Sequence, residues 1–270
     1  TGCLTAKVKT VITSKRFVQQ AKLEDLVEAM GHFVRILYLE DLRKSLSLPD
    51  KLYGLAASKL PRRFAHRAQP SDIGVILFTS GSFGTPRGVV LTQANLVLNC
   101  AQIAAHIELK PEWVCFNPMP IFHSLGLTGG LILPLLQGMR SFQYPSPLHV
   151  KQIPGLLKET KASLLFSTDT FLNQYARQAQ PDDFATLAFV VCGAEKVRDE
   201  THKLFSEQYG LTVIEGYGVT ETSPVLAVNL PTDNHYGTVG RALPGMQLRL
   251  EVVEGIPEGG RLHVKGPNVM

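Results

Sequence analysis

A loop of small and hydroxylated residues between positions 79 and 88 has the composition needed to bind a polyphosphate. It follows an apolar, strand-like run from Val75 to Phe78 and contains Pro86, Arg87 and Gly88. Glycines let the backbone approach a ligand closely, hydroxyls and backbone N–H groups donate hydrogen bonds, and Arg87 adds a positive charge. We therefore expect phosphate contacts from Thr79, Ser80, Gly81, Ser82, Gly84 and Thr85.

The spacing within this loop excludes two other kinds of site. Neither Gly81 nor Gly84 has a second glycine five residues later, so the loop is not the G-x-x-x-x-G-K-[ST] phosphate loop. Ser82 has no glycine two residues before it, so the loop is not a G-x-S-x-G nucleophile elbow.

A second candidate site directly follows a strand predicted over 212–215. In open α/β sheets, ligands bind beyond the carboxyl ends of the strands. A tyrosine between two glycines can lay its ring against a base, and a carboxylate is the ligand that a nucleotide-bound Mg²⁺ requires. For an isolated match, a turn with a buried Tyr and a surface Glu would be the default interpretation. The residues are Glu215, Gly216, Tyr217, Gly218, Val219, Thr220 and Glu221.

Two further segments contain candidate site residues. Gly193, Ala194 and Glu195 follow a strand predicted over 188–192, as in many strand-to-helix turns. His123 lies within the segment 118–126, and a lone histidine is more often structural than catalytic. The glycines at positions 126, 129 and 130 leave room for a ligand along the helix predicted over 125–137, although close helix packing explains them equally well.

Predicted strands and helices alternate along most of the chain. We expect an α/β fold with mostly parallel sheets flanked by helices over residues 1–236, and the start of a small antiparallel β subdomain over 237–270. Residues 40–71 are expected to form a short helix and a loop. Thr92 is expected to cap the helix that it precedes. The predicted strands are 7–13, 34–39, 114–117, 163–167, 188–192, 212–215, 247–253 and 261–265, and the predicted helices are 20–30, 93–106, 125–137, 149–159, 170–178 and 199–209.

Composition and charge are those of a soluble globular chain. The 270 residues are 44% hydrophobic and 19% charged, and the formal net charge is +4. Arg62, Arg63, His66 and Arg67 form the densest basic stretch, which could face phosphate or anionic lipid but which we expect to be a solvated loop; nothing indicates nucleic acid. The apolar segment 125–136 is too short to span a bilayer, which takes roughly 20 residues. Four widely spaced cysteines and the lack of a signal peptide favour reduced thiols in the cytoplasm.

The order of these motifs resembles that of the acyl-adenylate-forming (AMP-binding) superfamily. The loop at 77–89 resembles its signature Thr-Ser-Gly-Ser-Thr-Gly-x-Pro-Lys-Gly, with Phe83 in place of Thr and Arg87 in place of Lys. The segment 215–221 resembles the motif Gly-Tyr-Gly-x-Thr-Glu without departure. Residues 118–126, 193–196, 237–245 and 259–267 resemble four further segments of the family, in the family's order.

This resemblance implies an enzyme that uses ATP and Mg²⁺ to activate a carboxylic acid. It implies that Tyr217 stacks on adenine, that Thr220 contacts the α-phosphate and that Glu221 binds Mg²⁺. It also implies that His123 lies beside the substrate carboxylate and that Arg87 neutralises phosphate charge. The remaining nucleotide contacts implied by the resemblance are Thr79, Ser80, Gly81, Ser82, Gly84, Thr85, Gly193, Ala194, Glu195, Glu215, Gly216 and Gly218.

Within the superfamily, one group is most similar. Residues 11–17, 38–42, 142–149 and 192–196 resemble the bacterial bifunctional 2-acylglycerophosphoethanolamine acyltransferase/acyl-[acyl-carrier-protein] synthetases. The resemblance implies activation of a fatty acid to acyl-AMP, transfer to the thiol of acyl carrier protein, and reacylation of a 2-acyl lysophosphatidylethanolamine. A long-chain fatty acyl-CoA synthetase, with CoA as acceptor, is the alternative.

The family's ribose-binding Asp and its mobile C-terminal domain, with the adenylation Lys, are expected beyond Met270. We therefore expect a central, soluble fragment that binds nucleotide or acyl-adenylate and turns over poorly by itself. A non-catalytic binding fragment is the corresponding alternative. We expect the longer protein to associate with the cytoplasmic face of a bacterial inner membrane.

Overall fold

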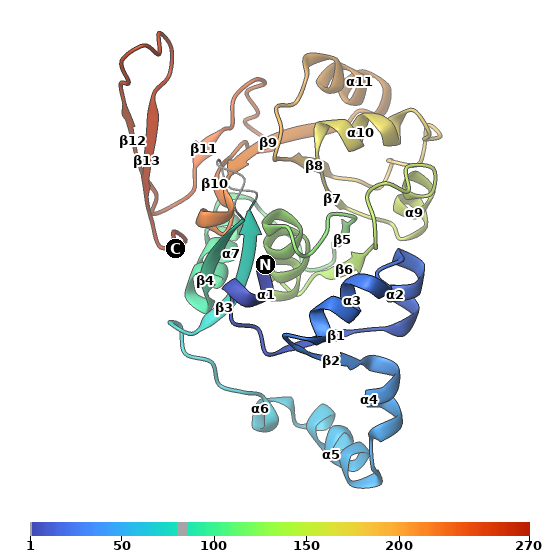
Figure 1. Ribbon diagram of the computed structural model, residues 1–270. Coiled ribbons are helices and arrows are strands. Elements are labelled where there is room, and N and C mark those ends of the chain that lie inside the picture. Colours follow the sequence, from blue (N-terminus) through green and yellow to red (C-terminus); the bar gives the residue numbers. More distant parts are fainter. Residues whose placement is uncertain (1, 80–85) are drawn as a thin grey trace. The chain divides into compact units, whose positions relative to one another are not determined.

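The computed structural model describes residues 2–79 and 86–270 of the chain, which is drawn in Figure 1. The chain forms two compact units. The first comprises Thr1–Gln69 and Phe78–Gly88, and the second comprises Pro70–Leu77 and Val89–Met270.

A seven-stranded sheet forms the centre of the second unit, in the order β11-β10-β9-β8-β7-β5-β6. From β6 to β9 all neighbours are parallel, whereas β10 and β11 are antiparallel to theirs. The predicted α/β class with a mainly parallel sheet is therefore confirmed, although β6, β10 and β11 were not predicted. The bounds are β5 (Val114–Asn117), β6 (Arg140–Gln143), β7 (Leu164–Ser167), β8 (Phe189–Cys192), β9 (Thr212–Gly218), β10 (Val225–Val228) and β11 (Arg241–Ala242).

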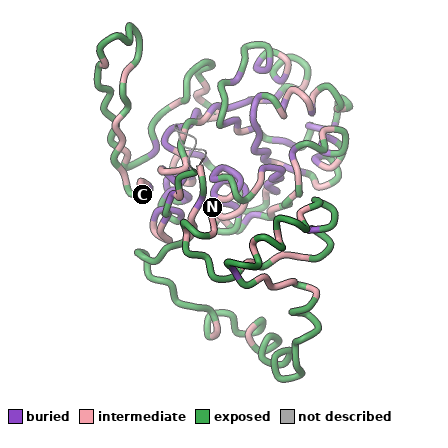
Figure 2. Tube along the Cα trace, viewed as in Figure 1, coloured by how far each residue is buried: buried purple, intermediate pink, exposed green. Residues whose placement is uncertain are grey.

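Helices cover both faces of this sheet because its strands are apolar on both faces. Phe116 and Leu165 belong to one hydrophobic core, and their neighbours Cys115 and Leu164 belong to the other. Figure 2 shows the buried residues concentrated along these strands. The first core contains residues of α9 (Ile153–Glu159), α10 (Asp169–Ala176) and α11 (Asp199–Tyr209), and the second contains residues of α7 (Gln93–His106), the π-helix η1 (Leu125–Ile132) and α8 (Leu133–Leu136).

The glycines of η1 allow it to pack closely against the sheet. A Cβ on Gly129 would lie 2.9 Å from the ring of Phe166, and a Cβ on Gly130 would overlap the side chain of Asn117. The Asn117 amide also donates to the carbonyl of Gly126 at 3.1 Å. Of the two explanations that the sequence left open for these glycines, close packing is the one that the contacts support.

Helix α7 carries a stripe of polar side chains that face the protein. Thr92 is its N-cap, as predicted, and forms a capping box with Asn95. Asn99 is fully buried; its amide donates to the carbonyl of Val225 at 2.8 Å, and its carbonyl accepts from the Val225 N–H at 3.1 Å. One and two turns further on, Gln102 donates to the carbonyl of Pro244 at 2.7 Å and His106 contacts the carbonyl of Val228 at 3.0 Å.

The C-terminal hairpin was predicted correctly. Strands β12 (Gln247–Glu251) and β13 (Arg261–Lys265) are antiparallel, with Glu251 opposite Arg261. The division of the chain at residue 237 stays a prediction, and so does the further mobile domain.

The first unit contains a parallel pair of strands, β1 (Thr10–Thr13) and β2 (Arg35–Tyr38), joined through helices as predicted. The helix predicted over 20–30 is two helices, α2 (Lys15–Ala21) and α3 (Glu24–Gly31), because Lys22 adopts a left-handed φ of 54° and ends α2. The segment predicted as a short helix and a loop contains three helices. These are α4 (Leu39–Ser45), α5 (Leu48–Lys59) and α6 (Pro61–Phe64).

The remaining elements are a short N-terminal helix and a two-stranded sheet whose strands have residues in both units. They are α1 (Gly2–Thr5), β3 (Ile73–Thr79) and β4 (Arg87–Thr92). All four cysteines are free. No helix within residues 2–79 and 86–270 is long and apolar enough to cross a bilayer.

We expect Asn99→Ala to destabilise the fold by about 2–4 kcal/mol, because two hydrogen bonds are lost and the N–H of Val225, a half-buried residue, loses its acceptor. Denaturant unfolding followed by circular dichroism measures this free energy. Leu98→Ala, at an exposed position of the same helix, is the matched control and should cost under about 1 kcal/mol. Equal losses in the two variants would contradict a structural role for the Asn99 amide.

Candidate active site

At the carboxyl end of β9, pairing with β8 on one side stops and pairing with β10 on the other side begins. Up to Glu215 it is parallel to β8, with Glu215 opposite Cys192; from Gly216 it pairs with the antiparallel β10. A Cβ on Gly193, in the turn that leaves β8, would lie 3.8 Å from the carbonyl oxygen of Gly216. The two segments predicted to contact the base therefore lie side by side at the carboxyl edge of the sheet, where ligands of open α/β sheets bind. The strand is also longer than predicted, since pairing with β10 extends it to Gly218.

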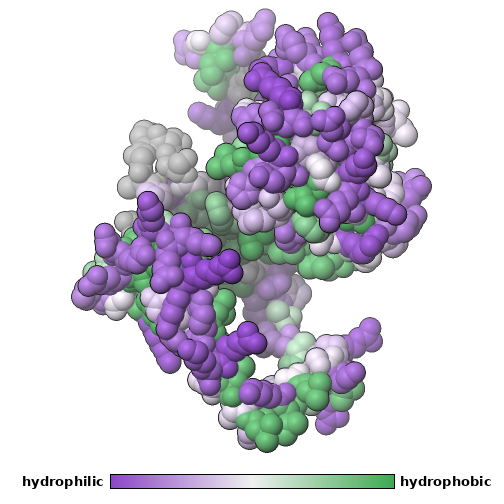
Figure 3. Space-filling view, turned by 90° about the vertical axis from the view of Figure 1, so that its right-hand side faces the viewer, coloured by the Kyte–Doolittle hydropathy of each residue, from purple (hydrophilic) through white to green (hydrophobic). Residues whose placement is uncertain are grey.

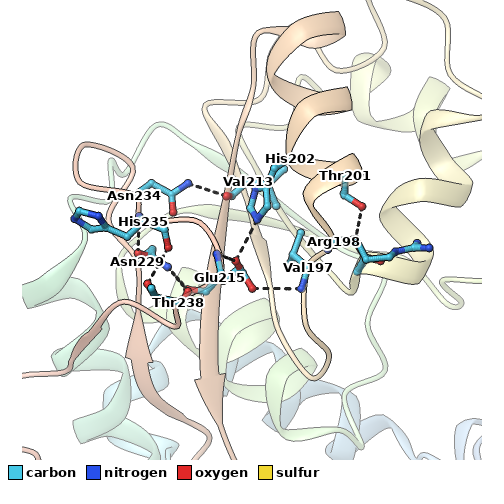
Figure 4. A network of polar contacts seen from close by, with 12 residues as sticks. Val197, Arg198, Thr201, His202, Val213, Glu215, Asn229, Asn234, His235 and Thr238 are labelled. Carbon is cyan, nitrogen blue, oxygen red and sulfur yellow. Dashed lines mark hydrogen bonds and ion pairs between the residues drawn. The ribbon is translucent and has the colours of Figure 1, made fainter.

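Glu215 has a buried carboxylate that accepts hydrogen bonds from three other segments of the chain (Figure 4). One of its oxygens accepts from the N–H of Gly237 at 3.0 Å and from Nε2 of His202 at 3.1 Å, and the other accepts from the N–H of Val197 at 3.3 Å. Its main-chain carbonyl accepts from the N–H of Asn229 at 2.9 Å. The carboxylate thus joins the turn after β8, helix α11 and the loop after β10 to the strand that carries Tyr217.

His202 was missed by sequence reasoning. Its ring is buried, stacks on Tyr236 with centroids 4.2 Å apart, and donates through Nε2 to Glu215 (Figure 4). Nδ1 has no hydrogen-bond partner among the residues that the structure describes. The proton therefore belongs on Nε2, because a buried N–H without an acceptor would cost more than a buried lone pair. The available signal was its position one turn before Phe205 in a predicted helix, which places both on the core-facing side.

In the turn after β8, the side chain of Glu195 is already hydrogen-bonded within the protein, which leaves the backbone of the turn to meet a ligand. Ala194 has a left-handed φ of 68°. The Glu195 carboxylate accepts from the N–H and the hydroxyl of Thr170 at 2.7 and 3.0 Å. Burial alone would raise the pKa of Glu195, but hydrogen bonds from Thr168 and Thr170 outweigh it and lower that pKa. The Glu195 side chain is therefore already engaged, and this turn offers its backbone, not that carboxylate, to a ligand.

A tight turn positions the two residues predicted to contact phosphate and metal. Thr220 and Glu221 lie in the short 3₁₀ helix η2 (Thr220–Thr222) and are half-buried. Asn268 donates to the carbonyl of Thr222 at 2.7 Å. A Cβ on Gly218 would overlap the carbonyl of Pro224, so the chain can close this turn only with glycine there.

The chemistry of Glu221 fits a Mg²⁺ ion carried by a nucleotide. Its carboxylate makes no hydrogen bond or ion pair with any residue that the structure describes. Within the same residues, no group of three His, Cys, Asp or Glu side chains could hold a metal. Mg²⁺ keeps several waters and binds one or two carboxylates together with substrate phosphates, so one free carboxylate is a suitable protein ligand. Tyr217, four residues earlier, is 41% exposed and can take a base against its ring.

His123 lies just before η1 and accepts a hydrogen bond at Nδ1 from the N–H of Leu125, at 3.3 Å. Desolvation by neighbouring protein lowers the pKa of the imidazole, although the residue as a whole is exposed. The ring is therefore neutral near pH 7. A neutral ring can line a pocket, but it cannot serve as a cation that neutralises phosphate charge. The side chain of Leu125 lies 3.6 Å from the position of a Cβ on Gly193, so η1 begins beside the turn after β8.

The predicted phosphate loop belongs to the first unit. Thr79 ends β3 and is half-buried, and Arg87 begins β4 and is exposed. Ser80, Gly81, Ser82, Phe83, Gly84 and Thr85 lie outside the described residues. The phosphate contacts expected of this loop stay predictions.

A comparison with known families identifies the chain at the level of its family. The sequence model of the AMP-binding enzymes matches residues 3–270. The chain belongs to the AMP-binding enzyme family. The resemblance drawn from the motifs at 77–89 and 215–221 is confirmed at this level.

Curated proteins similar to the chain include fatty-acid–CoA ligases. A long-chain-fatty-acid–CoA ligase of Escherichia coli O6:H1 is 28% identical over 267 residues, covering 92% of this chain and 47% of that protein. A medium-chain fatty-acid–CoA ligase of Escherichia coli K12 is 28% identical over 255 residues, covering 92% of this chain and 44% of that protein. The chain thus spans about half the length of the curated relatives it matches.

Two solved structures share its fold. Apo MatB from Rhodopseudomonas palustris superposes with a TM-score of 0.75 at 24% identity, covering 99% of this chain and 52% of that chain. O-succinylbenzoate coenzyme A synthetase (MenE) from Bacillus subtilis, in complex with ATP and a magnesium ion, superposes with a TM-score of 0.80 at 19% identity, covering 100% of this chain and 53% of that chain.

We expect Gly218→Ala to lower the stability of this AMP-binding enzyme by about 1–3 kcal/mol, because the new methyl group overlaps backbone that cannot move independently of β10. Gly155→Ala, in helix α9 with open space around it, is the control and should be neutral or stabilising by up to about 1 kcal/mol. Denaturant unfolding of both variants measures the difference. An unchanged free energy of unfolding for Gly218→Ala would show that this close approach does not exist.

Proposed function

We propose that the chain carries the nucleotide and acyl-adenylate site of a fatty-acid-activating acid–thiol ligase. In the first step a carboxylate oxygen of the fatty acid attacks the α-phosphorus of ATP, and pyrophosphate leaves. In the second step a thiol attacks the acyl carbon of acyl-AMP, and AMP leaves. The observation that carries the proposal is the juxtaposition, at the carboxyl end of β9, of an exposed tyrosine, the backbone of residues 193–195 and a carboxylate that has no partner among the described residues.

Tyr217 and the turn after β8 are the proposed adenine site. The ring of Tyr217 is flanked by glycines, and its exposed face offers a stacking surface to a base. Gly193 has no side chain to obstruct the approach of a ligand to the carbonyl of Gly216. In this proposal Glu195 and Glu215 position the backbone around the base through the hydrogen bonds described above.

Glu221 and Thr220 are the proposed ligands at the reacting phosphate. Glu221 holds the Mg²⁺ that neutralises phosphate charge, and the Thr220 hydroxyl donates to an α-phosphate oxygen. His123, neutral and close to the start of η1, lines the site of the fatty carboxylate. Most of the catalysis in such a site is positioning and charge stabilisation. Arg87 and residues 79–85 are proposed as phosphate ligands from the resemblance of their loop alone.

The thiol acceptor has two candidates. The names of the curated relatives support CoA, because those proteins are fatty-acid–CoA ligases. The resemblance of residues 142–149 and 192–196 to acyl-[acyl-carrier-protein] synthetases supports acyl carrier protein, with a lysophospholipid as the final acyl acceptor. Rates with CoA and with acyl carrier protein, measured on the longer protein, separate them: a higher rate with CoA would reject the second candidate.

We expect Glu221→Gln to lower fatty-acid-dependent ATP–pyrophosphate exchange by on the order of 100-fold, because Mg²⁺ loses its charged protein ligand. The assay is run on the longer protein with saturating Mg²⁺. Glu254→Gln, which makes the same chemical change on the exposed turn between β12 and β13, should leave exchange unchanged. Exchange within about twofold of the unmodified protein would contradict the metal role of Glu221.

A further inference from the structure

Helices α5 and α6 combine exposed leucines with a concentration of positive charge. We propose that this segment, residues 43–67, lies on the surface of an anionic lipid bilayer. The inference rests on the first unit alone and does not depend on the proposed function.

The apolar part of the surface is a row of leucines on α5. Leu48, Leu52 and Leu55 are spaced i, i+4 and i+7, so they share one face of the helix. They are 69%, 58% and 59% exposed, and no residue of α5 is buried. Leu60, directly after α5, is 57% exposed. An apolar stripe on a surface helix ordinarily faces a core, whereas this one faces outward. Figure 3 shows apolar surface bordered by hydrophilic atoms at the bottom of the view, the end where Figure 1 places α5.

The charge of the segment is unbalanced. Residues 43–67 contain seven lysines and arginines but only one carboxylate, Asp50. Their formal charge is therefore +6, whereas the whole chain carries +4. Asp50 is itself engaged by Ser47 in the capping box that begins α5. Among the described residues, none of the seven cations forms an ion pair within 4.0 Å. The seven are Arg43, Lys44, Lys51, Lys59, Arg62, Arg63 and Arg67.

The two properties occur on the same short stretch of chain, and this combination points to lipid. Lys59 follows Leu55 by four residues and shares its face, where a long aliphatic stem can lie along apolar surface while the ammonium reaches the headgroups. The ring of Tyr53 packs edge-on against that of Phe64, with centroids 5.2 Å apart, which holds α6 and its arginines next to α5. A soluble anion would use the cations but not the leucines. A bilayer surface uses both, with apolar side chains entering about 5–10 Å and basic side chains at anionic headgroups.

The test is flotation of the chain with phosphatidylglycerol vesicles, compared with phosphatidylcholine vesicles. We expect binding to the anionic vesicles alone, and weaker binding as ionic strength rises toward about 1 M, where the screening length falls to about 3 Å. Arg62→Glu with Arg63→Glu should weaken binding by at least about 25-fold, from about fivefold for each cation lost, because the two added carboxylates are also repelled by the anionic surface. Leu52→Ser should weaken it by about 10-fold.

Two matched controls separate this surface from general effects. Leu250→Ser, on β12, removes a leucine of the same 59% exposure as Leu55 from outside the segment. Lys151→Glu with Lys203→Glu changes the net charge by the same amount at exposed positions elsewhere. Both should bind vesicles as the unmodified chain does. Circular dichroism confirms that each variant is folded.

Hydrogen exchange of the unmodified chain provides a second measurement that requires no substitution. We expect amides of residues 48–64 to gain protection on anionic vesicles. The proposal is overturned by no vesicle binding at low salt, by equal losses in the control variants, or by protection elsewhere with none in α5. The alternative is self-association. If the unmodified chain does not bind vesicles, and its molecular mass in solution rises with protein concentration while Leu52→Ser stays a monomer, the leucine face contacts a second copy of the chain instead. Without lipid, Arg62→Glu/Arg63→Glu should bind an adenylate analogue as tightly as the unmodified chain does. A failure of the lipid-binding proposal is therefore distinguishable from a failure of the proposed function.

Discussion

The buried carboxylate of Glu215 is the interaction on which the geometry of the candidate site depends. A carboxylate removed from water must receive hydrogen bonds, and here the donors come from three segments far apart in the sequence: Val197, His202 and Gly237. Each donor belongs to a different element, so satisfying this one charge fixes the turn after β8, helix α11 and the loop after β10 relative to β9. The adjacent residues of β9 are those proposed to contact the base.

Buried side-chain amides hold the start of β10, where Val225 pairs with Gly218 at the end of β9. Asn99 bonds both backbone groups of Val225, and Asn268 bonds the carbonyls of Thr222 and Val225 at 2.7 and 3.2 Å. Strand β11 pairs only with Ala227 and Val228 of β10, and these side chains supply the hydrogen bonds that a longer neighbouring strand would make at Val225. These bonds hold the chain that leaves the turn with Thr220 and Glu221, and the proposed phosphate and metal site needs such preorganisation.

Much of the fold could be predicted from the sequence, because local patterns determine it. The strand 114–117 and the helices 93–106 and 199–209 have the predicted bounds, since their apolar spacing and the Thr92 cap are local signals. Strands β10 and β11 were missed because they are short and gain their stability from pairing with β9 and with each other. The break between α2 and α3 was missed because it depends on one left-handed residue, Lys22.

The site was predictable in part for the same reason. The positions of Tyr217, Thr220 and Glu221 follow from a contiguous motif, whereas the roles of His202 and Asn99 depend on contacts with residues 13 and 126 positions away. Glu215 was expected to contact the nucleotide, and the structure places its carboxylate inside the protein; only the three-dimensional arrangement shows which donors it meets. The charge of residues 43–67 was visible in the sequence, but the exposure of the leucines beside it was not.

The most direct test of the central claim, that the carboxyl end of β9 is a nucleotide site, is calorimetric titration of the chain with a non-hydrolysable fatty acyl-adenylate analogue. Saturable binding is predicted, with Tyr217→Phe near the unmodified chain and Tyr217→Ala weakened by about 10-fold or more, because stacking on a base is lost. No binding to a folded chain, or equal binding by Tyr217→Ala and the unmodified chain, would contradict it.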